Sequence, residues 1–285
     1  MKVRRLPDNP IIVPHMGERM GDNINGPSLI RVPEWVPGRL GEYYLYFAHH
    51  GGTHIRLAYA DALAGPWRVY EPGVLALEDA FFSRHIASPD IHVDEGEKRL
   101  RMYYHGPEPG RGQMTRAALS EDGLSFQARP ELISPSYFRA FDWEGMVYGM
   151  SMPGIFFRSA DGLTGFEQGP TLFGEHLRHG ALKLDGHRLS VFHTCAGDTP
   201  ERILLSTIDL KGDWQDWQAS EAEVVLEPEL EYEGADLPLE PSRRGAIRPR
   251  ARQLRDPCIY REGDRTYLLY AVAGEHGIAI AELEE

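Results

Sequence analysis

Polar side chains of the kinds that transfer protons recur along this 285-residue chain, each close to a short apolar segment. A carboxylate can act as a base or tune a neighbour's pKa, and an imidazole can donate a proton because it titrates near neutral pH. His179 is the predicted proton donor, and Asp256 is predicted to set the protonation of a neighbour. Asp22 and Asp90 are the further predicted catalytic carboxylates. Each Asp has a structural alternative, as a turn residue or as a cap on backbone N–H groups.

Twelve histidines form a second pattern, and several lie where a predicted strand ends. Neutral imidazoles from several strands can together hold a divalent metal, and the three that would do so are His50, His105 and His193. The alternative for each is a hydrogen-bonded core residue or a ligand contact, and no His-x-His or Cys-x-x-Cys spacing supports a local metal site. We therefore expect no required cofactor, with a structural divalent ion at the convergence point of the strands as the alternative.

The composition excludes several classes of protein. Hydrophobic residues make up 42% and charged residues 26%, which is typical of a globular chain. No run of eighteen apolar residues is present, so we expect no membrane partner. The net charge of −13 repels polyanions and argues against a nucleic-acid partner. Residues 1–20 lack the apolar segment of a signal peptide, so a cytoplasmic location is expected.

The chain contains an internal repeat, whose five units each open with a short apolar segment that in four cases follows a proline. The openings lie 46 to 76 residues apart, at residues 26–29, 88–91, 134–137, 180–183 and 256–259. A second segment rich in aromatic and β-branched residues follows each opening, as is typical of strands, at 43–47, 100–104, 146–148, 189–192 and 267–270. A third strand and an Asp-Gly turn then recur, as in Asp122-Gly123 and Asp161-Gly162.

Five units of about four strands predict an all-β, five-bladed β-propeller that forms one domain over residues 1–285. The predicted blades span 25–80, 81–133, 134–175, 176–250 and 251–285. The last unit is one strand short, so residues 10–13 are expected to pair with it and close the ring, which removes two exposed sheet edges. Residues 218–250, acidic at first and then rich in Arg and Pro, are expected to form a solvated loop or flap.

These units resemble those of the five-bladed glycosidases, namely the arabinanase, levansucrase and invertase-like enzymes, with glycoside hydrolase family 43 closest in pattern. The resemblance rests on IRLAYADALAGPW (55–67), IASPDIHVD (86–94) and RDPCI (255–259). It implies an Asp base at the first opening, a pKa-tuning Asp at the third and a Glu acid at the fourth. This chain departs at all three positions, with Gly26, Ser134 and His179 respectively. A related family acting on agar oligosaccharides is thought to use a His as its acid, which is compatible with His179.

The resemblance implies a glycoside hydrolase that cleaves an oligosaccharide or glycoside by acid/base catalysis in a central pocket. Arginines near the openings would bind the carboxylate of an acidic sugar bidentately, and tryptophans would stack on sugar faces. Pairing of each Arg with a neighbouring carboxylate is the alternative, and Glu144 fits a hairpin turn. The predicted substrate-binding residues are Asn25, Arg84, His85, His105, Arg139, Glu144, Arg178, His193, Trp35 and Trp143.

Three other functions fit the same pattern. The fold also supports a polysaccharide lyase-like or phosphorolytic enzyme, in which His or Tyr moves a proton and Arg neutralises an anion. A non-catalytic sugar-binding propeller is a third interpretation, because the family carboxylates are missing, and a peptide-binding scaffold is a fourth. A carbohydrate is the expected partner of the hydrolase, of the lyase-like or phosphorolytic enzyme and of the sugar-binding propeller.

Overall fold

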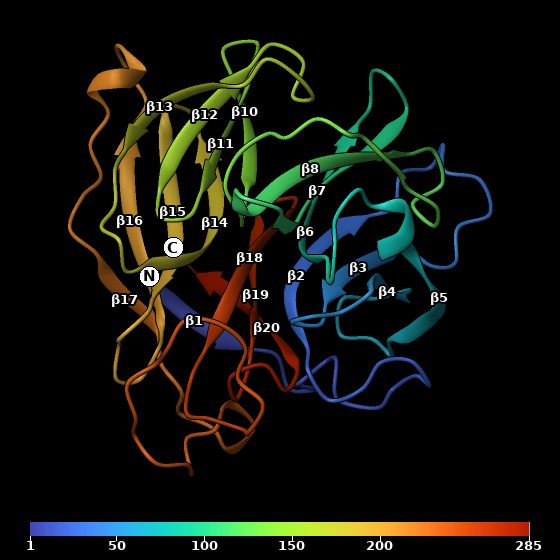
Figure 1. Cartoon of the computed structure of the whole chain (residues 1–285). Coiled ribbons are helices and arrows are strands. Elements are labelled where there is room, and N and C mark those ends of the chain that lie inside the picture. Colours follow the sequence, from blue (N-terminus) through green and yellow to red (C-terminus); the bar gives the residue numbers. More distant parts are fainter. Residues whose placement is uncertain (285) are drawn as a thin grey trace.

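Five four-stranded antiparallel sheets make up the computed structural model, which describes residues 1–284 (Figure 1). The sheets are arranged as the blades of a β-propeller, which confirms the predicted all-β, five-bladed fold. No helix within residues 1–284 is long and apolar enough to cross a bilayer.

Blades 1 to 4 each follow the chain from the inner to the outer strand, and blade 5 takes its outer strand from the N-terminus. Blade 1 has β2 (Asn25–Arg31), β3 (Tyr43–Ala48), β4 (His54–Ala60) and β5 (Arg68–Ala76); blade 2 has β6 (Ala87–Asp94), β7 (Arg99–Glu108), β8 (Gly112–Ser120) and β9 (Gln127–Ala128); blade 3 has β10 (Arg139–Trp143), β11 (Met146–Ser151), β12 (Ile155–Ser159) and β13 (Glu167–Thr171). Blade 4 has β14 (Leu177–Asp185), β15 (Arg188–Cys195), β16 (Ile203–Asp209) and β17 (Glu223–Leu226); blade 5 has β18 (Arg255–Glu262), β19 (Arg265–Ala271), β20 (Ile278–Glu284) and β1 (Lys2–Arg5). Within residues 1–284, three short 3-10 helices lie outside the sheets: η1 (Leu77–Asp79), η2 (Trp214–Asp216) and η3 (Glu231–Glu233).

The second strands carry the core because both of their faces are covered by neighbouring blades. All six residues of β3 are buried, so the sequence shows a continuous apolar run rather than alternation. Tyr44 and Tyr46 pack toward blade 2 against Leu100 and Met102, whereas Leu45 packs in the cluster shared with blade 5. Burial between blades therefore explains why aromatic segments mark each repeat.

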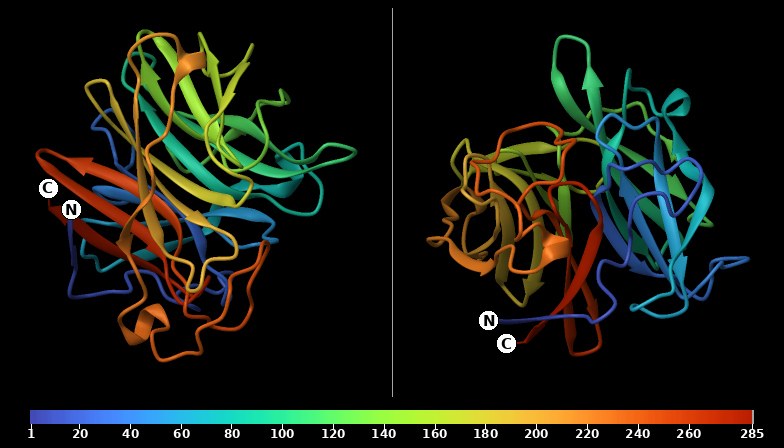
Figure 2. Two further views of the ribbon diagram at one scale, coloured as in Figure 1. Left: turned by 90° about the vertical axis from the view of Figure 1, so that its left-hand side faces the viewer. Right: turned by 90° about the horizontal axis from the view of Figure 1, so that it is seen from below.

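The ring is closed by the N-terminal strand pairing with the last blade, and the two termini lie side by side (Figure 2). The prediction that residues 10–13 form this strand was wrong. The closing strand is β1, which pairs Lys2 with Glu284 and Arg5 with Ala281. Residues 10–13 make one isolated bridge, Ile12 to Ile278, at the start of β20. Pro10 lacks the N–H that a continuous ladder needs, whereas residues 2–5 contain no proline.

Two other sequence boundaries also differ from the prediction. Blade 3 begins at Arg139, and Pro135 instead bridges to Met114 in blade 2. Residues 218–250 are only partly a solvated loop, because they contain the outer strand β17 and the fully buried side chain of Glu233. The later part of this segment returns to the propeller and contributes Arg244 and Gly245 to a central cavity.

The inner strands are interrupted near their first residues by backbone in the left-handed region. Gly26, Ser88 and Asp256 have φ of +59°, +49° and +49°, and the pairing register of their strands shifts at these positions. Tyr137, just before β10, has φ of +64°. Such bulges redirect side chains, and strain of this kind in non-glycine residues concentrates at functional sites. The four positions all lie at or beside one cavity.

Candidate functional site

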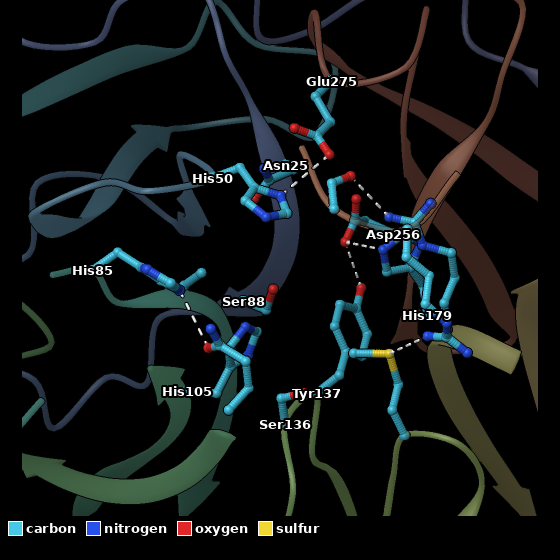
Figure 3. Close-up of a pocket in the computed structure, with 16 residues that line it drawn as sticks. Asn25, His50, His85, Ser88, His105, Ser136, Tyr137, His179, Asp256 and Glu275 are labelled. Atoms are coloured by element: carbon cyan, nitrogen blue, oxygen red, sulfur yellow. Dashed lines mark hydrogen bonds and ion pairs between the residues drawn. The ribbon is translucent and has the colours of Figure 1, made fainter. Parts of the chain in front are cut away.

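A cavity of about 340 Å³ lies where the inner strands begin, and all five blades contribute to it (Figure 3). Its walls carry four histidines, two carboxylates and two arginines. The lining residues are Asn25, His50, His85, Ala87, Ser88, His105, Gln113, Ser136, Tyr137, Met152, Arg178, His179, Arg244, Gly245, Asp256 and Glu275. The cavity is therefore polar and has the size of a small-ligand site.

His179 is fixed in one orientation by a buried hydrogen-bond chain. Its Nδ1 lies 2.9 Å from Thr194 Oγ1, and Thr194 Oγ1 lies 2.8 Å from Glu201 Oε1. Burial alone would raise the pKa of Glu201, but its contact with His179 and the charges of two arginines lower it to about 2. Glu201 is therefore ionised and only accepts, so the Thr194 hydroxyl donates to it and His179 Nδ1–H must donate to Thr194. The other ring nitrogen, Nε2, is left for the cavity.

Asp256 faces that nitrogen, with His179 Nε2 lying 3.6 Å from Asp256 Oδ1 (Figure 3). The Tyr137 hydroxyl donates to the same oxygen at 2.8 Å, and Asp256 Oδ2 has no hydrogen-bond partner within residues 1–284. Burial lowers the pKa of His179, and the negative charge of Asp256 opposes that shift. Two lone pairs facing each other repel, whereas a proton on His179 Nε2 would make this contact attractive.

Glu275 is the second carboxylate of the cavity, and its environment keeps it ionised. Arg255 donates to Glu275 Oε1 at 2.9 Å, and Asn23 donates to Oε2 at 2.5 Å. His50 Nδ1 lies 3.4 Å from Oε1. Burial alone would raise the pKa of Glu275, but these contacts lower it to about 2. Glu275 is therefore ionised near neutral pH and does not serve as a proton donor there.

Two further histidines of the cavity, His85 and His105, have lowered pKa values and are neutral near pH 7. Burial, assisted by neighbouring cationic groups, lowers the pKa of His105 to about 3, and burial lowers the pKa of His85. His85 Nε2 lies 3.2 Å from Gln113 Oε1 on the side of the cavity opposite His179 (Figure 3). Neutral imidazoles both donate and accept, so these side chains suit hydroxyl-bearing ligands.

The structure brings together about half of the residues that were predicted for the site. Seven of them line the cavity: Asn25, His50, His85, His105, Arg178, His179 and Asp256. Arg178 does so with its guanidinium already engaged by Glu201 Oε2 at 3.1 Å and by the carbonyls of Arg243 and Gly245. For Arg178, the structure thus shows the alternative interpretation, in which the Arg pairs with a neighbouring carboxylate.

Two predicted catalytic carboxylates lie outside the cavity. Asp22 is exposed on the loop before β2. Asp90 Oδ2 instead accepts hydrogen bonds from His92 Nε2 at 2.7 Å and from the backbone N–H of Ala140 at 2.9 Å. Burial alone would raise the pKa of Asp90, but His92 and Arg139 outweigh it and lower the pKa. The carboxylate of Asp90 thus joins blades 2 and 3, in line with its structural interpretation.

The other predicted binding residues are also placed elsewhere. Arg139 is buried beneath the cavity, with its guanidinium 4.2 Å from the Tyr137 ring centroid. His193 packs against Phe173, and Arg84 lines a neighbouring cleft. Trp143 and Glu144 lie at the β10–β11 hairpin, away from the cavity, and Trp35 Nε1 donates to Glu95.

The histidines proposed to hold a metal do not converge. His50 and His105 line the cavity, whereas His193 does not. Within residues 1–284, no group of three or more His, Cys, Asp or Glu side chains is arranged to hold a metal ion.

Four important residues were missed by the sequence analysis: Tyr137, Thr194, Glu201 and Glu275. Tyr137 stands in a quoted opening, so its position was a usable signal. Glu201 and Glu275 lie in connections between strands, where nothing in the local pattern separates a buried carboxylate from the many solvated ones.

Comparison with known proteins places the chain in a family. No family model matches it. Uncharacterized protein R118 of Acanthamoeba polyphaga mimivirus is 37% identical over 323 aligned positions, which cover 99% of this chain and 90% of the viral protein. The chain belongs to the family of that viral protein.

Solved structures that superpose on this chain include glycosidases of family 43. A β-xylosidase/α-arabinofuranosidase from a compost microbial metagenome superposes with a TM-score of 0.65 at 14% identity, over 99% of this chain and 96% of that one. An α-L-arabinofuranosidase from Lactobacillus brevis gives 0.60 at 12% identity, over 97% and 92%. The resemblance to the five-bladed glycosidases is thereby confirmed for the fold.

Proposed function

We propose that this protein is a glycoside hydrolase that binds one sugar ring in the central cavity and cleaves its glycosidic bond by acid catalysis. The observation that carries the proposal is the His179–Asp256 pair, buried in the cavity wall and 3.6 Å apart. When His179 is protonated, its Nε2–H lies in the cavity wall, where a leaving oxygen could receive the proton.

The assignment of roles follows from the protonation states. With Nδ1–H committed to Thr194, His179 donates from Nε2, and Asp256 stabilises the imidazolium before transfer. The ionised Glu275 supplies the negative charge that an oxocarbenium-like transition state requires, either next to the anomeric carbon or by activating a water. This arrangement uses Glu275 in place of Asp22 and Asp90.

The lyase-like alternative has less support from the geometry. Burial and the adjacent charge of Asp256 raise the pKa of Tyr137 well above 10, so its phenolate is not readily available as a base. Arg178, the expected anion binder, is engaged by Glu201. Arg244 remains as a cationic group at the cavity for an acidic sugar.

Aryl glycosides provide the test, with Asp256→Asn as the decisive variant and Asp22→Asn as the matched control outside the cavity. The panel starts with β-xylosides and α-arabinofuranosides, because the structural neighbours act on such sugars by name, and includes uronides. Asp256→Asn is expected to lower kcat by about 10²- to 10⁴-fold, and Asp22→Asn to leave it unchanged. Full turnover by folded Asp256→Asn refutes the mechanism. Sugar binding without turnover by the wild type would instead indicate the non-catalytic propeller.

A further inference from the structure

A second cleft, of about 770 Å³, adjoins the central cavity on the blade 1–blade 2 side. Two chain segments contribute to both hollows. In the β3–β4 connection, His50 lines the cavity and Thr53 lines the cleft; before β6, His85 lines the cavity and Arg84 lines the cleft. The two hollows are therefore neighbours, with His85 at the border between them.

An exposed phenylalanine marks this cleft. Phe81 is 55% exposed, whereas its neighbour Phe82 packs edge-on against Tyr104. The backbone at Phe81 has φ of +54° and that at Arg84 has φ of +74°, both in the left-handed region. For a bulky residue such a conformation is costly and is retained where the surroundings demand it, as at ligand clamps. The fold thus holds an aromatic ring in water at the edge of the cleft.

Polar groups surround that ring in the manner of a sugar-binding surface. Arg84 makes no ion pair or side-chain hydrogen bond with any residue that the structure describes. Arg19, Thr53, Asp79 and Ser83 complete a mixed set of donors and acceptors. An apolar platform beside donors and acceptors matches a sugar ring, which has apolar C–H faces and a rim of hydroxyls.

We propose that this cleft is a second subsite, in which Phe81 stacks on the sugar unit next to the one in the central cavity, so that the ligand is an oligosaccharide. The inference rests on the proposed function for its direction, since the first ring lies against His179 and Asp256. The chain of sugars then passes His85 and reaches Arg84 and Phe81. A single sugar or a small aryl glycoside occupies the central cavity alone.

Matched ligands of different length test the subsite. Binding by calorimetry is measured for xylose against xylotriose, arabinose against arabinotriose, and galacturonate against its trimer. Phe81→Ala is expected to weaken trisaccharide binding about tenfold, because the variant lacks the apolar ring surface that the sugar would cover. Monosaccharide binding is expected to stay unchanged. Phe81→Trp keeps an aromatic ring and is expected to retain trisaccharide binding. Leu239→Ala, at a residue that is also 55% exposed but outside both hollows, is the control.

The outcomes separate this inference from the proposed function. Trisaccharide binding that depends on Phe81, without turnover, supports the subsite and refutes the hydrolase. Turnover of aryl glycosides with no preference for trisaccharides over monosaccharides refutes the subsite alone. The inference is overturned if the wild type binds no trisaccharide more tightly than the corresponding monosaccharide. It is also overturned if Phe81→Ala binds trisaccharides as tightly as the wild type does.

Discussion

Replacing Thr194 with Val removes one hydroxyl from the chain that orients His179. The Thr194 side chain is fully buried and Val has nearly the same shape, so the substitution removes the hydrogen bonds of the hydroxyl with little change in packing. His179 Nδ1 then has Glu201 Oε1 as its nearest acceptor, at 3.5 Å, which is beyond a good hydrogen bond. A buried donor left without a partner costs about 1–3 kcal/mol.

The kinetic effect follows from the tautomer. Without Thr194 Oγ1, His179 loses the acceptor that holds its proton on Nδ1, and the imidazolium becomes less stable. We expect kcat to fall about 10- to 100-fold, which corresponds to about 1.4–2.7 kcal/mol, with KM unchanged. Thr194→Ser keeps the hydroxyl and is expected to stay within about threefold of the wild type.

The pH profile supplies a readout that a structural role would not change. Burial lowers the pKa of His179 below its usual 6.5, so the protonated donor is lost as pH rises through that lowered value, and hydrolysis is expected to be fastest in mild acid. Thr194→Val should move the alkaline limb to lower pH, and ¹⁵N shifts of the imidazole should report the altered tautomer. Equal kcat and equal profiles for Thr194→Val and Thr194→Ser would refute the reasoning.

Three further predictions concern stability, each measured by urea unfolding. Arg5→Ala is expected to lower the free energy of unfolding by about 3 kcal/mol, because the fully buried Glu233 loses the Arg5 guanidinium, which lies 2.7 Å away. The control Lys2→Ala breaks an ion pair between exposed side chains and should cost under about 0.5 kcal/mol. Equal losses for the two variants would contradict the argument that Arg5 secures ring closure. Asp90→Asn should cost about 1–3 kcal/mol, because the carboxylate accepts from both His92 and the Ala140 N–H, yet keep KM when folded; wild-type stability with lost turnover would return Asp90 to the mechanism. The free energy of unfolding should fall as the pH drops from 7 to 4. The reason is that His105, with a pKa of about 3, stays neutral in the folded protein but binds a proton in the unfolded chain below about pH 6.5. His105→Gln should flatten this pH dependence, and an unchanged slope would contradict the assignment to His105.

Much of the fold could be predicted from the sequence because the repeated signal is redundant. Five aromatic second strands are each buried between blades, so the same physical demand appears five times, and one weak opening at residues 180–183 does not obscure it. Ring closure was placed on the wrong segment because a strand of four residues, Lys2–Arg5, has no apolar run of its own. Its position depends on Arg5 reaching Glu233, a contact across 228 residues of sequence.

The site was predictable to the extent that it lies on the repeat. Asn25, His179 and Asp256 stand at strand openings, and the same opening logic applies to Tyr137. Asp90 also stands at an opening, but a register shift between Ala87 and Asp90 accompanies the left-handed Ser88, and Ala87 and Ser88 line the cavity instead. A bulge of this kind changes which side chain faces inward, and it depends on backbone conformation that residue types alone do not specify.

The charges around the cavity explain why one carboxylate in particular is available to the proton donor. Glu201 lies 3.2 Å from Arg255 and 3.1 Å from Arg178, and Glu275 shares Arg255 at 2.9 Å. These two carboxylates and two guanidiniums balance. Asp256 is left with a histidine and a tyrosine as its side-chain partners, and one oxygen has none within the described residues. The negative charge of Asp256 therefore opposes the lowering of the His179 pKa by burial and stabilises the imidazolium that donates the proton.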